Sequence, residues 1–146
     1  MARSAVAGAG AAGVWAAQQP LDKRVFGCPY DDVELLGKLV TRGRGWPLAG
    51  TALHLANGAG FGAAYFFIRP YLPGPAWAHG LLAAQVENFG LWPLGRLSDR
   101  YHPARDELPR LGGNRRALAQ ATWRHGLFGI VLGVAEARLN RTSSES

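Results

Sequence analysis

LAGTALHLANGAGFGAAYFFI, residues 48–68, is a long run of the chain without a formal charge. A stretch of this length and composition predicts a helix able to cross a bilayer. Gly58 and Gly62 lie four residues apart, a spacing that lets two membrane helices pack closely. His54 and Asn57 interrupt the apolar run, and polar side chains in lipid are costly enough to need partners. We therefore expect a membrane helix that buries polar groups against its neighbours.

Three further apolar segments extend this pattern along the 146-residue chain. We expect spans over residues 4–19, 48–68, 76–97 and 117–139, which form a single domain over residues 1–140, and a disordered tail over 141–146. Asp31 can cap a short amphipathic helix, Glu34 completes its capping box, and this helix should lie on the cytoplasmic membrane surface. The predicted fold class is an all-α integral membrane bundle of four transmembrane helices with one short cytoplasmic interfacial helix.

The net charge of +6 is distributed unevenly among the predicted loops. Eleven Lys and Arg residues fall between the first and second spans or between the third and fourth, and four fall on the other side. The positive-inside rule then places both termini outside the cytoplasm, in a cell inner membrane. Anionic lipid headgroups at the basic loops, rather than nucleic acid, are the expected partners. The mean hydropathy of −0.04 is low for such a protein and leaves a soluble fold as an alternative.

Polar residues in the middles of three predicted spans form the candidate site. Measured at 1.5 Å per residue from the cytoplasmic helix ends, six of them (His54, Asn57, Glu87, Asn88, Arg124 and His125) lie at similar depths of about 9 to 15 Å. Glu87 and Arg124 can therefore meet as a buried ion pair, which relieves part of a cost of at least about 2.5 kcal/mol for an unpaired charge. The predicted buried cluster consists of His54, Asn57, Glu87, Asn88, Gln120, Arg124 and His125.

This cluster has three interpretations. In the favoured one it only fixes how the helices pack, and the chain is a structural or accessory membrane component of unassigned activity. In the second, Glu87, His54 and His125 move protons or bind a ligand in a small transporter, plausibly a homo-oligomer. In the third, His54 and His125 hold a metal or haem in a membrane-embedded enzyme, although no ligand spacing indicates one. The sequence does not identify a catalytic residue, and we expect no resident cofactor.

Gly8-Ala9-Gly10-Ala11-Ala12-Gly13 matches the dinucleotide-binding fingerprint letter by letter. The fingerprint has meaning only between a buried strand and a helix of a βαβ unit. Only seven residues precede it here, and no later segment suggests alternating strands and helices. Close packing of small residues in a helix explains the motif better.

Two segments, QQPLDKR at residues 18–24 and QATWRHG at residues 120–126, carry a resemblance to known proteins. Together with His102-Pro103 and Glu107-Leu108-Pro109, they resemble small uncharacterised bacterial inner-membrane proteins. The opening Gly/Ala helix and the general layout are similar to the YagU-like inner-membrane family. The resemblance implies an integral membrane protein without an assigned activity, and it supplies no catalytic residues.

Overall fold

The computed structural model describes residues 1–141, and all of their regular structure is helical, which confirms the all-α prediction. The elements are α1 (Ala2–Phe26), α2 (Asp32–Val40), α3 (Trp46–Ile68), the 3-10 turn η1 (Arg69–Tyr71), α4 (Ala76–Leu91), the 3-10 turn η2 (Trp92–Leu94), α5 (Gly95–Tyr101) and α6 (Arg115–Arg141). Within these residues, no helix has both the length and the apolar character required of a membrane span. Apart from Arg141, the predicted tail lies outside the described residues.

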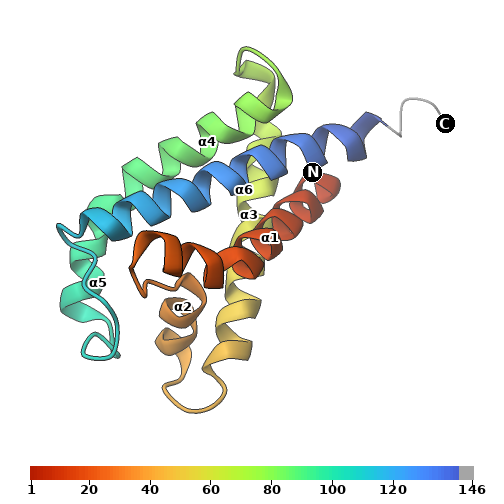
Figure 1. Ribbon diagram of the computed structural model, residues 1–146. Helices are drawn as coiled ribbons and strands as arrows, with labels where there is room; N and C mark the ends of the chain where they lie inside the picture. Colours follow the sequence, from red (N-terminus) through yellow and green to blue (C-terminus); the bar gives the residue numbers. More distant parts are fainter. Residues whose placement is uncertain (142–146) are drawn as a thin grey trace.

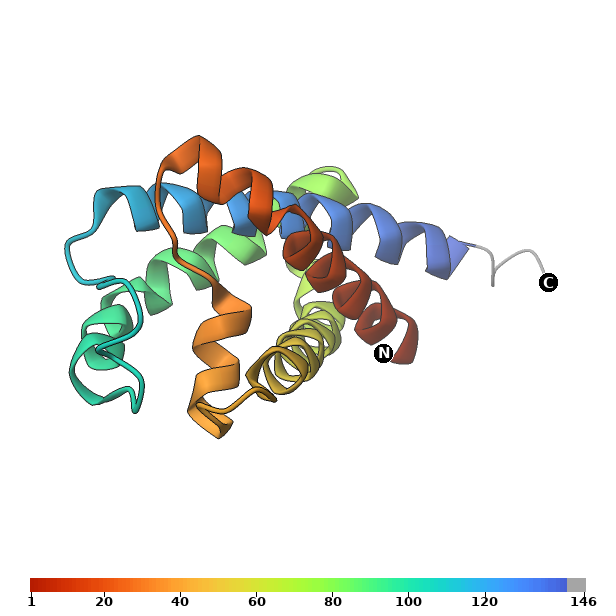
Figure 2. The same ribbon diagram turned by 60° about the horizontal axis from the view of Figure 1, so that its bottom comes forward.

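α1 is longer than the predicted span, because it continues through Pro20 and ends only at Phe26. Gly27 terminates it in a left-handed conformation, with φ 59°, and its N–H donates to the Lys23 carbonyl. A proline inside a helix lacks one N–H and crowds the preceding turn, which accounts for the bend of α1 seen in Figures 1 and 2. This continuation places Asp22 on the same buried face as Trp15.

α6 is the centre of the arrangement, with α1 and α4 both packed against it (Figure 1). Both run antiparallel to α6, because the start of each lies beside the C-terminal half of α6: Ser4 bonds to Glu136, and Gly80 approaches Gly129. α3 packs against α1, and α2 packs against α3. α3 and α4 follow one another in the sequence but diverge from the turn that joins them, as Figure 2 shows.

Glycines mark the places where these helices approach most closely. A Cβ atom on Gly58 of α3 would lie 2.5 Å from the Ala12 Cβ and 2.7 Å from the Gly8 carbonyl oxygen of α1. Contacts this short mean that backbone packs directly on backbone. The predicted pair Gly58/Gly62 is confirmed as a helix contact, Gly129 and Gly133 form a second one of the same spacing, and both contacts lie within one chain.

The short helix predicted after Asp31 is present as α2, and the Asp31 carboxylate caps it by accepting the Glu34 N–H at 3.0 Å. It does not lie apart from the other helices, however. Gly37 packs so closely on α3 that a Cβ atom there would be 2.1 Å from the Trp46 carbonyl oxygen. α2 and α3 thus form a helical hairpin through residues 41–45.

The predicted span over residues 76–97 is divided in the structure. α4 ends at Leu91, and the chain passes through η2 into the short helix α5. Pro93 lies in η2, where its missing N–H ends the regular α-helical bonding.

The two basic loops meet at one end of the bundle. Lys38 of α2 pairs with Glu107 at 2.8 Å, Arg42 also pairs with Glu107, and His102 Nε2 lies 2.9 Å from the Leu35 carbonyl oxygen. Hydrogen bonds from Lys38 and Arg42 lower the pKa of the Glu107 carboxyl below its ordinary value. Hydrogen bonds to Glu107 and Glu34 raise the pKa of the Lys38 ammonium. These contacts attach the segment after α5 to α2.

The opposite end of the bundle has its own buried acid. Glu136 is 2% exposed, accepts the Ser4 hydroxyl at 2.9 Å and pairs with Arg69. Arg3 donates to the Leu139 carbonyl at 3.0 Å. The N-terminus and the end of α6 therefore lie together, far from the basic loops (Figure 1).

We predict that Gly58→Ala lowers the free energy of unfolding by about 2 kcal/mol, because the new methyl group would overlap Ala12 and the Gly8 carbonyl. Gly60→Ala is the matched control, since a Cβ atom there meets nothing within 4 Å. It should be neutral or stabilising, by up to about 1 kcal/mol, through helix propensity. Chemical denaturation followed by circular dichroism compares the two. Equal losses would contradict the close crossing of α1 and α3.

The contact between Glu107 and α2 should depend on pH. The lowered pKa of Glu107 means that this carboxylate stabilises the docked loop above its ordinary pKa of 4.5, and that the effect is lost as the pH falls through the lowered value. Amide hydrogen exchange over residues 103–111, corrected for intrinsic rates, should therefore speed up in acid. Glu107→Gln should abolish this acceleration of exchange in acid, whereas Asp106→Asn should retain it. An acceleration that survives Glu107→Gln would have another origin.

Candidate functional site

Arg124 of α6 is fully buried and is bound by two aspartates. Its Nε and Nη2 atoms donate to the two carboxylate oxygens of Asp22, each at 2.6 Å. This is the bidentate geometry that arginine commonly forms with a carboxylate. Nη1 donates to Asp32 at 2.7 Å, and Nη2 also donates to the Tyr30 carbonyl at 2.9 Å. Each of the three guanidinium nitrogens therefore has an acceptor.

Two glutamines complete the surroundings of Asp22. Gln120 donates to one carboxylate oxygen at 2.6 Å, and Gln18 donates to the other at 2.5 Å. Trp123 in turn donates to the Gln18 side chain at 3.0 Å. The segments 18–24 and 120–126 thus contact each other here. Gln120 Oε1 is buried without a partner, but the bonds to Asp22 and Arg124 still hold α1 against α6.

The predicted ion pair between Glu87 and Arg124 is not formed. The carboxylates on Arg124 come from Asp22 and Asp32, while Glu87 faces His125, with 3.7 Å between Glu87 Oε2 and His125 Nε2. Equal depth along two helices did not give contact, because the side chains leave α4 and α6 in different directions. The predicted single cluster is therefore divided among separate sites.

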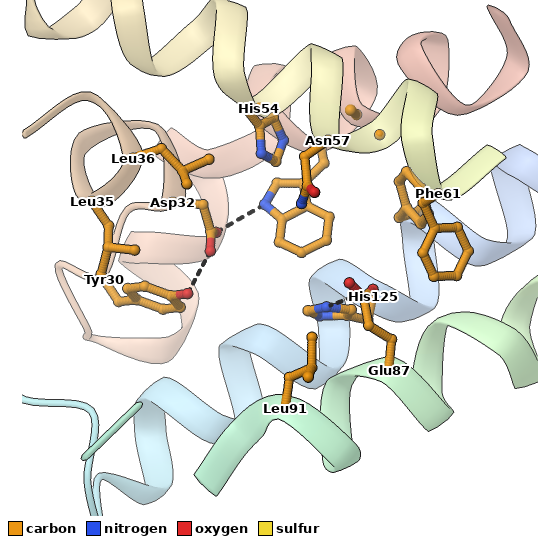
Figure 3. A pocket seen from close by; sticks show the side chains of 14 residues that line it. Tyr30, Asp32, Leu35, Leu36, His54, Asn57, Phe61, Glu87, Leu91 and His125 are labelled. Atoms are coloured by element: carbon orange, nitrogen blue, oxygen red, sulfur yellow. Dashed lines mark hydrogen bonds and ion pairs between the residues drawn. The ribbon is translucent and has the colours of Figure 1, made fainter. Parts of the chain in front are cut away.

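Four of the predicted residues, His54, Asn57, Glu87 and His125, line one pocket. Its volume is about 300 Å³, and Figure 3 shows side chains of α3, α4, α6 and the α2 region around a common space. His54 is 6% exposed, Glu87 and His125 are partly buried, and Asn57 is exposed, which corrects its predicted burial. The pocket lies where α3 and α4 diverge.

Trp15 of α1 organises one wall of this pocket. Its ring meets His54 and His125 edge to face, with centroid distances of 5.2 and 4.6 Å. Its indole N–H donates to Asp32 at 3.1 Å, so the same carboxylate binds Trp15 and Arg124. Burial raises the pKa of Tyr30 well above its usual value, and the protonated phenol also donates to Asp32. Asp32 thereby joins the ion network to the pocket.

The two histidines present free ring nitrogens at the pocket. His125 Nδ1 lies 2.8 Å from the Ala121 carbonyl oxygen, so Nδ1 carries the proton. The other ring nitrogen, Nε2, faces Glu87. His54 hydrogen-bonds to the backbone of Ala12, and its buried Nε2 has no hydrogen-bond partner. Unpaired buried polar atoms are uncommon in native structures, and each requires an explanation.

Asn88, the last predicted residue, belongs to a third site. It donates to Gln85 at 3.3 Å and to the Thr122 hydroxyl at 3.2 Å, and Gln85 donates to the Thr122 carbonyl at 2.9 Å. These bonds link α4 to α6. We assign Asn88 to helix packing.

The structure gives no support to a metal site at His54 and His125. Among residues 1–141, no group of three or more His, Cys, Asp or Glu side chains is placed to hold a metal ion. Both rings instead pack against the same indole, that of Trp15.

Comparison with known proteins adds no relative: no family model, no curated protein and no solved structure matches this chain.

The sequence analysis missed Trp15, Asp22, Tyr30 and Asp32. Asp22 lies beyond the predicted first span, which ends at residue 19, just before Pro20. Had the helix been continued, the spacing of Ser4, Ala11, Trp15 and Asp22 would have put all four on one face. No local pattern identifies Tyr30 or Asp32, whose positions depend on the turn that follows α1.

We predict that Asp22→Asn lowers the free energy of unfolding by about 3 kcal/mol, because it leaves the buried Arg124 guanidinium undercompensated. Glu87→Gln should cost less than about 1 kcal/mol, because this partly exposed carboxylate holds no helix in place. Denaturant titration of both purified variants tests whether the Arg124 network, and not Glu87, holds the helices together. A larger loss for Glu87→Gln than for Asp22→Asn would contradict it.

Proposed function

We propose that this protein is an integral membrane protein that binds a small molecule in the pocket formed by His54, Asn57, Glu87 and His125. The observation that carries the membrane part is an inverted distribution of side chains. The largest side chains that are fully buried include Arg124, Gln120, Glu136 and Asp22. Large apolar side chains are instead exposed over α1, α3, α4 and α6, among them Val6 at 64%, Phe67 at 61% and Val86 at 65%.

Such an inversion suits a hydrocarbon environment. Charged groups in membrane helices face the bundle interior and pair there, and small residues form the helix contacts. A bundle in water would instead bury its apolar side chains, since large exposed apolar surfaces promote association. The proposed spans lie in α1, α3, α4 and α6, and the third ends with α4 at Leu91 rather than at residue 97.

The placement of the loops supports an orientation in a cell inner membrane. Ion pairs of Glu107 with Lys38 and Arg42 join the two basic loops at one end of the bundle. The N-terminus and the end of α6 lie at the other end (Figure 1). The positive-inside rule then gives a cytoplasmic end with the basic loops and both termini outside. The resemblance to small bacterial inner-membrane proteins agrees with this proposal.

Ligand binding is proposed because the polar groups that line the pocket make fewer hydrogen bonds than those around Arg124. Around Arg124 every guanidinium nitrogen has an acceptor, although the Gln120 Oε1 atom has no partner, and this network fits a role in packing. Around the pocket, His54 Nε2 has no partner, and Glu87 has only His125 at 3.7 Å. Open space, free polar atoms and aromatic walls are features of small-molecule sites. A transporter would use the same pocket as its substrate site.

Extraction and labelling test the two parts of the proposal. The protein should stay in the membrane pellet after an alkaline carbonate wash and enter solution only with detergent. In a Cys28→Ser background, Asn57→Cys should react with a small maleimide, because position 57 is exposed at the pocket. Ala11→Cys, at a fully buried position, should not react. Release by carbonate would refute the membrane proposal, and an unreactive position 57 would refute an open pocket.

A further inference from the structure

We propose that the pocket takes a small organic cation, an alkylammonium group, with the Glu87 carboxylate as its counter-charge. This inference rests on the binding site proposed above and specifies the chemistry of its ligand. The juxtaposition that carries it is a free carboxylate and four aromatic side chains around a cavity that no lysine or arginine lines.

The charges around the pocket leave an excess of negative charge. One guanidinium, that of Arg124, serves both Asp22 and Asp32. Lys23 is already paired with Asp31. Glu87 adds a further carboxylate, and among residues 1–141 the basic side chain that it pairs with is His125. A cation in the cavity therefore meets a favourable field, whereas an anionic ligand would find no fixed positive group to bind it.

The walls of the pocket suit a cation with an apolar surface. Trp15, Phe128 and Phe61 form a continuous series of edge-to-face contacts, with centroid distances of 6.1 Å for Trp15 to Phe128 and 5.3 Å for Phe128 to Phe61. Tyr30 contributes a fourth ring that lines the pocket. Aromatic faces attract ammonium groups, and rings around quaternary ammonium ligands are a recurrent means of recognition.

Two of the pocket's remaining polar groups can act as acceptors. With the proton on Nδ1, His125 Nε2 accepts, and the Glu87 carboxylate also accepts. Asp32 is already occupied by Trp15, Tyr30 and Arg124. Glu87 is therefore the binding group, and the volume of about 300 Å³ accommodates a small ligand rather than a peptide.

Three probes of similar shape but different charge test this inference on the purified full chain in detergent: tetramethylammonium, tert-butanol and pivalate. Saturation-transfer NMR of their methyl signals should show saturable binding of tetramethylammonium alone. Glu87→Gln should weaken it about tenfold, and Phe61→Leu, which keeps the bulk but removes the ring, about threefold. Asp106→Asn, a charge loss at an exposed position away from the pocket, is the matched control. Maleimide on Asn57→Cys should block binding.

Each other outcome overturns the inference. Equal binding of tert-butanol would mean an apolar void, and preferential binding of pivalate would mean the opposite charge preference. Unchanged affinity in Glu87→Gln, or no binding of tetramethylammonium, would remove the cation site. If circular dichroism shows that Glu87→Gln does not fold, Phe61→Leu still tests the proposal. Binding of tetramethylammonium to Phe61→Leu with unchanged affinity would also refute it. Labelling of position 57 without cation binding would leave the proposed pocket intact and reject only its ligand.

Discussion

The buried guanidinium of Arg124 is the constraint on which the other parts of this structure depend. Without exposed surface, it can be accommodated only where two carboxylates reach it from different segments, Asp22 from α1 and Asp32 from the start of α2. Their positions fix the path of the turn between the two helices. They also fix Trp15, whose N–H binds Asp32 and whose ring forms a wall of the pocket. The site is therefore a consequence of how one charge is satisfied.

Glycine contacts supply the second constraint, since they determine where the helices can touch. Close backbone approach at Gly58 and Gly129 draws α3 onto α1 and α4 onto α6. Because α3 and α4 are each drawn to a different neighbour, they separate beyond the turn that joins them. The polar side chains on their facing sides, including Asn57 and Glu87, then border a cavity instead of bonding to each other.

Local patterns in the sequence were sufficient for part of this description. The helices, the cap at Asp31 and the glycine pairs followed from residue spacing, since each depends on neighbours a few positions away. The partner of Arg124 did not, because depth along a helix is only one coordinate and the direction of the side chain around the axis is another. Ending the first helix at Pro20 also removed Asp22 from consideration, although α1 tolerates that proline with a bend.

The sequence separation of the central pair affects the order in which the fold can form. Asp22 and Arg124 are 102 residues apart, so the ribosome completes α1 long before it reaches α6. During that interval the Asp22 carboxylate has no guanidinium to pair with and is best left hydrated, as is the neighbouring Asp32. Before α6 is synthesised, the pairing of Asp22 with Arg124 therefore cannot stabilise the final packing of α1. The arrival of α6 is the event that lets both acids leave water and closes the bundle.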